Sequence, residues 1–175
     1  MEEFMLVRPC EKYAAEISAY RQEFLDLSNS MDGAGPLRRI ADPMQYIKMC
    51  AEYENPKTVP TNLVPATQFL FVRSSDSRVL GMIQVRHCFN EYLEKYAGHI
   101  GYSVRPSERR RSYAKKMLAM TLPFCRELGL EKVLICCLVG NEGSEKTIRA
   151  NGGEFESIVH CPERDVDLKR FWITL

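Results

Sequence analysis

The spacing of large apolar residues predicts two helices in the first third of the chain. The first covers residues 12–27, where these residues recur every three or four positions. The second begins in "DPMQYIKM", because Asp42 can cap its first turn and Pro43 needs no hydrogen-bond partner there. The aromatic residues of both helices are expected to lie in the core: Tyr13, Tyr20, Phe24, Tyr46 and Tyr53. The turn-rich segment between the helices, "SNSMDGAGPLRR", is expected to be a mobile loop.

Strands dominate the rest of the chain. "QFLFVR" and "VLGMIQVR" flank "SSDS" and predict a hairpin, "HIGYSV" predicts a third strand, and the apolar run "KVLICCLV" predicts a strand buried on both faces. "EFESIV" and "LKRFWITL" predict a final antiparallel pair. Helical segments follow the third strand and the apolar run, and Pro123 is expected to kink the first of them. We therefore predict one α/β domain over residues 1–175, with a central mixed, mostly antiparallel sheet and helices on both faces.

The overall composition excludes several classes of protein. The chain has 175 residues, 45% of them hydrophobic and 27% charged, with a net charge of +1. A charge this small favours neither nucleic acid nor an anionic membrane as a partner. The beginning of the chain does not resemble a signal peptide, and no apolar run is long enough to cross a bilayer. Seven cysteines without metal-ligand spacing predict no metal site and a reducing, cytoplasmic location.

The segment "GHIGYSVRPSERRRSYAKKML", residues 98–118, contains the strongest functional pattern. A strand enters a helix through a short turn, and the first backbone N–H groups of such a helix have no partner within it. These donors and the helix dipole favour an anion such as phosphate. Arg109, Arg110 and Arg111 add positive charge, while Ser112 and Ala114 are small enough for close approach. A solvated basic helix start is the alternative interpretation.

The same segment resembles the acyl-CoA-binding motif of the GNAT acetyltransferase superfamily, R/Q-x-x-G-x-G/A. Arg109 and Ala114 match its ends, and "GYSVRP" resembles the strand that precedes it. Asn141 and the pattern S-x-x-x-I-x-x-N-G-G from Ser144 to Gly153 also match. The closing "KRFWITL" is similar to that of a bacterial subfamily of acetyltransferases with unassigned substrates.

The resemblance implies an N-acetyltransferase with acetyl-CoA as co-substrate and an amine on a small molecule or peptide as acceptor. The residues that it places at the cofactor are Tyr102, Ser103, Val104, Arg109, Arg110, Arg111, Ser112, Tyr113, Ala114, Asn141 and Ser144. Ser112 stands where the family usually has glycine. With a negative φ serine would fit there, and with a positive φ it would cost about 1 kcal/mol or more.

The catalytic groups are predicted less directly. The resemblance implies direct attack of the amine, with a backbone N–H near Tyr102 to Val104 as the oxyanion donor. His99, next to the expected thioester, is a candidate base, and a histidine hydrogen-bonded within the sheet is the alternative. Ile148 occupies the place of the family's usual tyrosine, so Tyr102 is a candidate acid; protonation by water and departure of an unprotonated thiolate are the alternatives. His87 and Glu91 are candidate substrate-binding residues.

Two further alternatives remain open on the sequence. Cys137 could form an acyl-enzyme, but apolar neighbours favour an inert core thiol. Loss of the usual glycine and tyrosine is compatible with a catalytically weak acyl-CoA-binding sensor or interaction module that keeps the same fold. An exposed edge strand would permit a homodimer.

Overall fold

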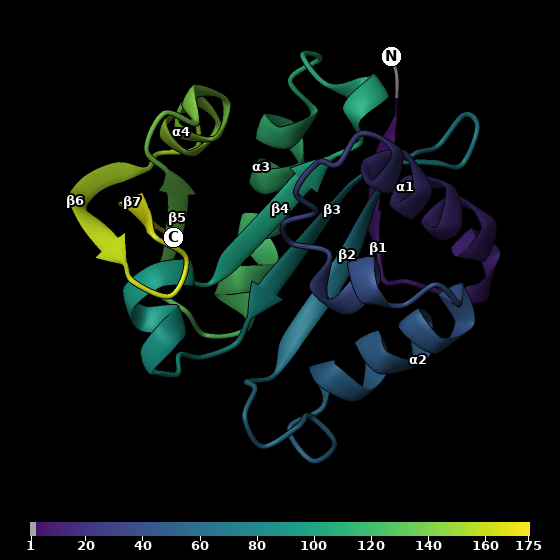
Figure 1. Cartoon of the computed structure of the whole chain (residues 1–175), viewed down its shortest axis with the longest axis horizontal. Helices are drawn as coiled ribbons and strands as arrows, with labels where there is room; N and C mark the ends of the chain where they lie inside the picture. Colours follow the sequence, from purple (N-terminus) through teal and green to yellow (C-terminus); the bar gives the residue numbers. More distant parts are fainter. Residues whose placement is uncertain (1–2) are drawn as a thin grey trace.

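The computed structural model describes residues 3–175, which form two antiparallel sheets side by side (Figure 1). The larger sheet has the strand order β1-β2-β3-β4, with bounds Phe4–Val7, Ala66–Arg73, Arg78–Arg86 and Ile100–Val104. The smaller sheet has the order β5-β7-β6, with bounds Lys132–Leu138, Val166–Thr174 and Glu154–Cys161. Every ladder within the two sheets is antiparallel. The predicted antiparallel character and the single domain with mixed α/β structure are thus present.

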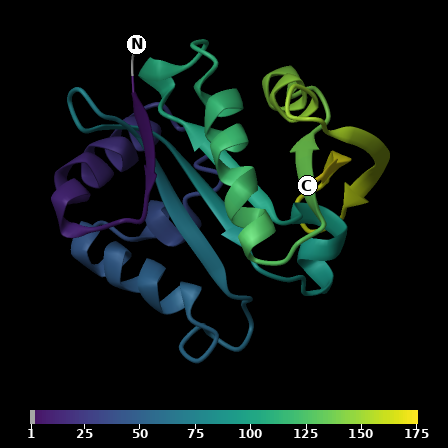
Figure 2. The same cartoon turned by 180° about the vertical axis from the view of Figure 1, so that it is seen from behind.

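Helices cover both faces of the larger sheet. α1 (Ala14–Asp26) and α2 (Pro43–Glu54) lie on one face, and α3 (Tyr113–Glu127) lies on the other, as the two opposite views show (Figures 1 and 2). α4 (Glu142–Arg149) follows β5 and packs beside it. The shorter elements are the 3-10 turns Glu11–Tyr13, Gly35–Arg39 and Pro106–Glu108 and the single π-helical turn Leu93–Ala97.

Alternation along β2 explains why this sheet has a core on each side. Leu70 and Val72 belong to the cluster under α1 and α2, whereas Phe69 and Phe71 belong to the cluster under α3. Successive strand side chains point to opposite faces, so a strand covered on both faces needs apolar residues at every position. The near-continuous apolar pattern of β2 follows from this double coverage.

Two local features differ from the sequence predictions. β1 was not predicted, because its four residues are too short a run to show alternation. Segment 28–39, predicted as a mobile loop, is packed against the fold: Met31, Ala34 and Leu37 are buried. Pro123 lies inside α3, which continues to Glu127, and the kink expected there stays a prediction. Asp42 caps α2 as predicted, with its carboxylate accepting from the Met44 N–H at 2.9 Å.

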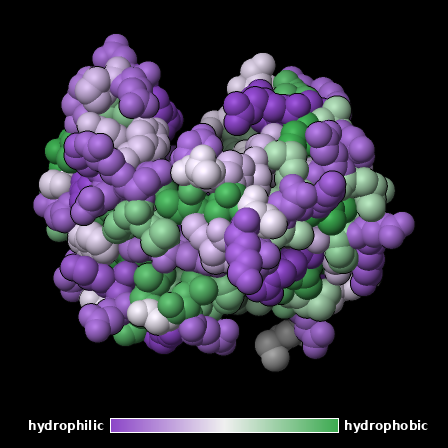
Figure 3. Space-filling model, turned by 90° about the horizontal axis from the view of Figure 1, so that it is seen from below, coloured by the Kyte–Doolittle hydropathy of each residue, from purple (hydrophilic) through white to green (hydrophobic). Residues whose placement is uncertain are grey.

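The two sheets separate along β4 and β5. In the part of the chain that the structure describes they are joined by one isolated bridge, between Gly98 and Ile135, and by the His99 N–H donating to the Leu134 carbonyl at 2.8 Å. β4 then runs on with β3 as its only strand partner among the described residues. The space-filling view shows a notch between the two lobes that the sheets form (Figure 3).

Candidate active site

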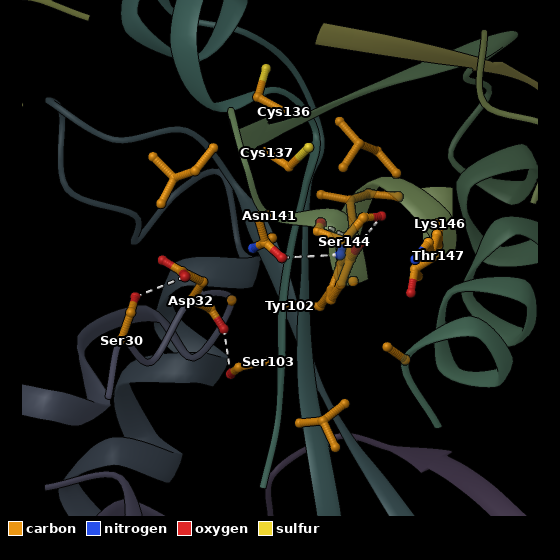
Figure 4. Close-up of a pocket in the computed structure, with 18 of the residues that line it drawn as sticks. Ser30, Asp32, Tyr102, Ser103, Cys136, Cys137, Asn141, Ser144, Lys146 and Thr147 are labelled. Atoms are coloured by element: carbon orange, nitrogen blue, oxygen red, sulfur yellow. Dashed lines mark hydrogen bonds between the residues drawn. The ribbon is translucent and has the colours of Figure 1, made fainter. Parts of the chain in front are cut away.

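A cavity with a volume of about 970 Å³ lies where β4 and β5 separate. Its walls come from segment 29–33, from β4, from the start of α3, from β5 and from the start of α4 (Figure 4). Ten of the eleven residues predicted for cofactor binding line this cavity: Tyr102, Ser103, Val104, Arg109, Arg110, Ser112, Tyr113, Ala114, Asn141 and Ser144. The remaining one, Arg111, lies outside the lining. Segments that are forty residues apart in sequence therefore meet around one cavity.

One edge of β4 presents backbone hydrogen-bonding groups to this cavity. The Arg105 N–H donates to the Leu80 carbonyl at 2.8 Å, and antiparallel partners alternate between bonded and non-bonded pairs. With the observed register of Ile83 opposite Tyr102, the backbone groups of Tyr102 and Val104 therefore point away from β3. Apart from the Val104 carbonyl, which accepts from the Arg109 Nε at 3.1 Å, this open edge can pair with an extended ligand as another strand would.

The start of α3 presents further backbone donors at one end of the cavity. Ser112 is the N-cap residue, and its side chain makes no capping hydrogen bond. The Lys116 N–H donates to the Ser112 carbonyl, so the preceding N–H groups have no partner within the helix. Ser112, which replaces the family's usual glycine, has φ +60°. Its backbone is therefore left-handed, a conformation that is strained for serine.

The three consecutive arginines have three different environments. Arg109 turns back onto the fold: its Nε donates to the Val104 carbonyl at 3.1 Å, and its guanidinium lies over Phe24. Arg111 lies 3.6 Å from the carboxylate of Glu108. Arg110 lines the cavity, has φ +63° and has no ion-pair partner among residues 3–175. Of the three, Arg110 is therefore the one free to meet an anion at the helix start.

Glu108 is a buried carboxylate beneath this turn. It lies 3.1 Å from Arg78, 3.6 Å from Arg73 and 3.6 Å from Arg111. Because buried charge needs compensation, these three guanidinium groups fix the position of the carboxylate. The turn that leads into α3 is therefore anchored to β2 and β3.

Tyr102 reaches across the cavity to α4. Its hydroxyl lies 2.8 Å from the Ser144 Oγ, and the Asn141 side chain accepts from the Ser144 N–H at 3.1 Å (Figure 4). Burial raises the pKa of Tyr102, so the phenol is protonated at neutral pH. Asn141 thus caps α4, and Ser144 connects that helix to β4.

His99 lies outside the cavity lining and is buried. Its Nδ1 accepts from the Leu134 N–H at 2.9 Å, and its ring packs against Phe89 and Trp172. Burial, assisted by the charge of Arg86, lowers the pKa of His99 to about 4. The lone pair on Nδ1 is already used, and the surroundings are aromatic. This geometry matches the alternative interpretation of a histidine bonded within the sheet.

The structure also places His87 and Glu91 outside this cavity. His87 lies 2.8 Å from the Thr67 hydroxyl, which donates to Glu54 at the far side of the larger sheet, and burial lowers the pKa of His87. Glu91 is exposed and paired with Lys95 at 2.8 Å, which lowers the pKa of Glu91. Neither side chain is brought to the residues around Tyr102.

Both thiols of the buried strand line the cavity, yet neither environment favours a thiolate. Burial raises the pKa of Cys136 to about 12 and also raises the pKa of Cys137. A nucleophilic cysteine needs a nearby positive charge or base that lowers its pKa. The structure therefore agrees with the prediction that Cys137 is not an acyl-forming nucleophile.

The opposite end of the cavity contains residues that the sequence analysis did not single out. Asp32 comes from segment 29–33, Arg86 from the end of β3, Tyr92 and Tyr96 from the π-helical region, and Arg164 from the β6–β7 turn. No motif links these positions, because they come from four separate parts of the chain. The only signal in the sequence was the charged residue at the end of the apolar strand β3.

Within the described residues, no group of three or more histidine, cysteine, aspartate or glutamate side chains is placed to hold a metal ion. None of the helices in residues 3–175 is long and apolar enough to cross a membrane.

An open strand edge beside an uncapped helix start defines the acyltransferase class that the motif indicated. Residues 38–154 match the family model described as the acetyltransferase (GNAT) domain. This match covers more than half of the chain, and the protein therefore belongs to the GNAT acetyltransferase family. No curated protein matches it in sequence.

Solved structures share the fold over nearly the whole chain. The microcin C7 self-immunity acetyltransferase MccE, in complex with acetyl-CoA and AMP, is 16% identical with a TM-score of 0.71, covering 99% of this chain and 93% of its own. The ribosomal-protein-S5-alanine acetyltransferase from Vibrio fischeri is 15% identical with a TM-score of 0.72, covering 99% and 94%. A spermidine N-acetyltransferase SpeG chimera from Vibrio cholerae and hSSAT is 14% identical with a TM-score of 0.64, covering 98% and 95%.

Proposed function

We propose that this protein transfers the acetyl group of acetyl-CoA to a primary amine by direct attack, within the cavity between β4 and β5. The acceptor is a small molecule or a peptide. The observation that carries the proposal is the open edge of β4, which leads directly to the uncapped start of α3. Extended pantetheine can pair with such an edge, and a diphosphate suits such a helix start.

The residues present fit acetyl-CoA. The free N–H groups at the start of α3 and the side chain of Arg110 would hold the diphosphate, and the backbone of Tyr102 and Val104 would hold the pantetheine arm. Asn141 and Ser144 line the wall opposite. Acetyl-CoA supplies an activated acetyl thioester. The left-handed Ser112 adds a Cβ to this cradle where glycine would leave bare backbone.

Two groups of the chain have chemical roles in this proposal. A backbone N–H on the open edge of β4 donates to the thioester oxygen and stabilises the charge that develops there. The Tyr102 hydroxyl, which burial keeps protonated, donates a proton to the departing sulfur, and the proton that the attacking amine loses restores the phenol. Tyr102 would take the role of the family's usual tyrosine. That position is occupied here by Ile148, a fully buried core residue of α4. We assign His99 a structural role, because its Nδ1 already accepts a backbone N–H.

The cofactor assignment is tested by Arg110→Glu in isothermal titration with acetyl-CoA. We expect roughly tenfold weaker affinity or more, because the substitution places a negative charge beside the diphosphate. Arg126→Glu changes the charge by the same amount at the other end of α3, where the residue is exposed and remote from the cavity. Equal effects of the two substitutions would refute the assignment.

The role of Tyr102 is tested by thiol release from acetyl-CoA with a panel of amines. Tyr102→Phe should lower kcat roughly a hundredfold with acetyl-CoA affinity retained, because only the proton donor is lost. Ser144→Ala removes the hydrogen-bond partner but keeps the phenol, and should lower kcat much less. Binding of acetyl-CoA by the unmodified protein without thiol release for any amine would favour the sensor alternative.

A further inference from the structure

Arg86 places a guanidinium in the wall of the cavity, beside the strand that holds the proposed thioester. The residue ends β3, and its Nη1 donates to the carbonyls of Ala97 and Gly98, each at 3.2 Å. Its Nη2 lies 3.3 Å from the position that a Cβ would occupy on Gly101. Gly101 precedes Tyr102, so the guanidinium lies about one residue away from the open edge of β4.

The charge of Arg86 has no carboxylate partner. Among residues 3–175, no carboxylate lies within ion-pair distance of it, and Nε and Nη2 have no hydrogen-bond acceptor. Burial lowers the pKa of its guanidinium, which reflects the cost of holding this charge away from water. Arg105, by comparison, is buried and pairs with Glu16 at 3.0 Å. An anionic group from a ligand would complete the environment of Arg86, and a carboxylate matches its planar fork.

Asp32 supplies the opposite charge in the same cavity. Its carboxylate accepts from the Ser30 hydroxyl at 2.7 Å, and its backbone carbonyl accepts from the Ser103 hydroxyl (Figure 4). It lines the same cavity and is near enough to act electrostatically on Arg86, where it opposes the effect of burial. A Cβ on Gly101 would lie 3.3 Å from both the Arg86 Nη2 and the Gly33 Cα, so Arg86 and the segment that carries Asp32 lie on the same face of β4.

We propose, on the basis of the acetyl transfer proposed above, that the acceptor is a free amino acid whose carboxylate binds Arg86 and whose amine is held by Asp32. The spacing supports this class of substrate. A strand advances about 3.3 Å per residue, so an anion at Arg86 lies only a few ångströms from an amine at Tyr102. An α-amino acid has its two charged groups that close together. The amino terminus of a peptide chain has no such carboxylate, and a polyamine would bring positive charge to Arg86.

The first experiment uses the unmodified protein and measures thiol release from acetyl-CoA with free amino acids and with their carboxamides. The expected result is acetylation of one or more amino acids, with kcat/KM at least about a hundredfold above that of the matching carboxamide, because the carboxamide leaves Arg86 unpaired. The carboxamide holds more of its amine as free base at neutral pH, so intrinsic reactivity would favour it. Equal or faster reaction of carboxamides, peptides or spermidine overturns the proposal.

The second experiment assigns that preference to Arg86. Arg86→Met should reduce the ratio of kcat/KM for the acid over the carboxamide at least tenfold, and Arg86→Lys should reduce it less, because charge remains without the fork. Asp32→Asn should raise the KM for the amino acid. Arg21→Met is the matched control: Arg21 is also half-buried and donates only to backbone carbonyls, those of Leu37 and Arg38, outside the cavity. An unchanged ratio in Arg86→Met overturns the proposal, because a merely structural arginine would not set it.

These measurements separate the two proposals. Acetyl-CoA binding and turnover without a preference for the acid would refute the amino acid acceptor and leave acetyl transfer intact. Lack of acetyl-CoA binding in titration would refute both.

Discussion

The two ends of the cavity are built in different ways. At the α3 end, the proposed cofactor groups come mainly from one stretch of the chain, Tyr102 to Ala114, in which a strand, a turn and a helix follow one another. At the other end, Asp32, Arg86, Tyr92 and Arg164 come from four separated segments. The first end is a local structure that its own sequence specifies. The second exists only because the chain folds.

This difference determines how each end can vary. The α3 end depends mainly on backbone N–H groups and on backbone geometry, with Arg110 as the charged side chain expected at the diphosphate. The other end depends on side-chain charge at positions that distant contacts hold in place. Substitutions that disturb those contacts should therefore change the KM for the acceptor and leave the affinity for acetyl-CoA largely unchanged.

The largest expected effect is that of Gly33→Ala at the acceptor end. Gly33 has φ +68°, and a Cβ there would lie 2.1 Å from the Gly101 carbonyl oxygen. We expect a loss of about 2–5 kcal/mol in the free energy of unfolding, from left-handed strain and from overpacking. Urea denaturation measures this loss. The surviving folded protein should show a raised acceptor KM with little change in acetyl-CoA affinity.

Gly152→Ala is the control for this substitution. Gly152 has φ +85°, but a Cβ there would meet nothing within 4 Å. Its cost should therefore be the backbone strain alone, about 1–2 kcal/mol. If both substitutions cost the same, the close approach of segment 29–33 to β4 is not what positions the acceptor end.

The next effect concerns His99, which joins the two sheets where the cavity closes. Its pKa is lowered from 6.5 to about 4, so the folded state disfavours its protonation. Below pH 6.5 the unfolded chain takes up this proton and the folded chain does not. The free energy of unfolding should therefore decrease as the pH is lowered below 6.5. His99 should account for about 3 kcal/mol of this decrease at pH 4.

Urea denaturation of wild-type and His99→Asn protein between pH 8 and pH 4 measures this contribution. Asparagine keeps an acceptor for the Leu134 N–H but does not titrate in this range. The stability advantage of the wild type at pH 8 should shrink by about 3 kcal/mol on acidification. A difference that is independent of pH would show that His99 is protonated as easily in the folded state as in the unfolded state.

The smallest expected effect lies at the α3 end. Ser112→Gly relieves left-handed strain and should raise the free energy of unfolding by roughly 0.5–1 kcal/mol, after the entropy cost of glycine is subtracted. Acetyl-CoA affinity should rise or stay constant, and the acceptor KM should not change. Ser107→Gly, at a serine without positive φ, should instead reduce stability. A loss of stability in Ser112→Gly would contradict the strain assigned to this turn.

Most helices and strands could be predicted from the pattern of apolar and polar residues. α1 and α2 have helical spacing and a cap at Asp42, and β2 and β3 are long enough for their apolar runs to be recognised. β1 was missed because four residues do not define a period. Segment 28–39 was interpreted as mobile because its glycines and proline are typical of loops, whereas Gly33 is required for close packing on Gly101.

The candidate site divides in the same way. The motif located the turn at Arg109, but it could not show that Arg109 turns back onto the fold while Arg110 faces the cavity. His99 drew attention because its ordinary pKa suits a base. Burial against Phe89 and the hydrogen bond from Leu134 removed that advantage, and neither is visible in the order of residues.

The sequence by itself determined the elements, the family motif and the helix start that can hold an anion, because these depend on neighbours within a few positions. Only the tertiary structure decided which charges are paired, which side chains line the cavity, and that Asp32 and Arg86 lie on one face of β4 in the same cavity. Pairing and burial depend on residues far apart in the chain, and desolvation then sets the charge that each group can carry.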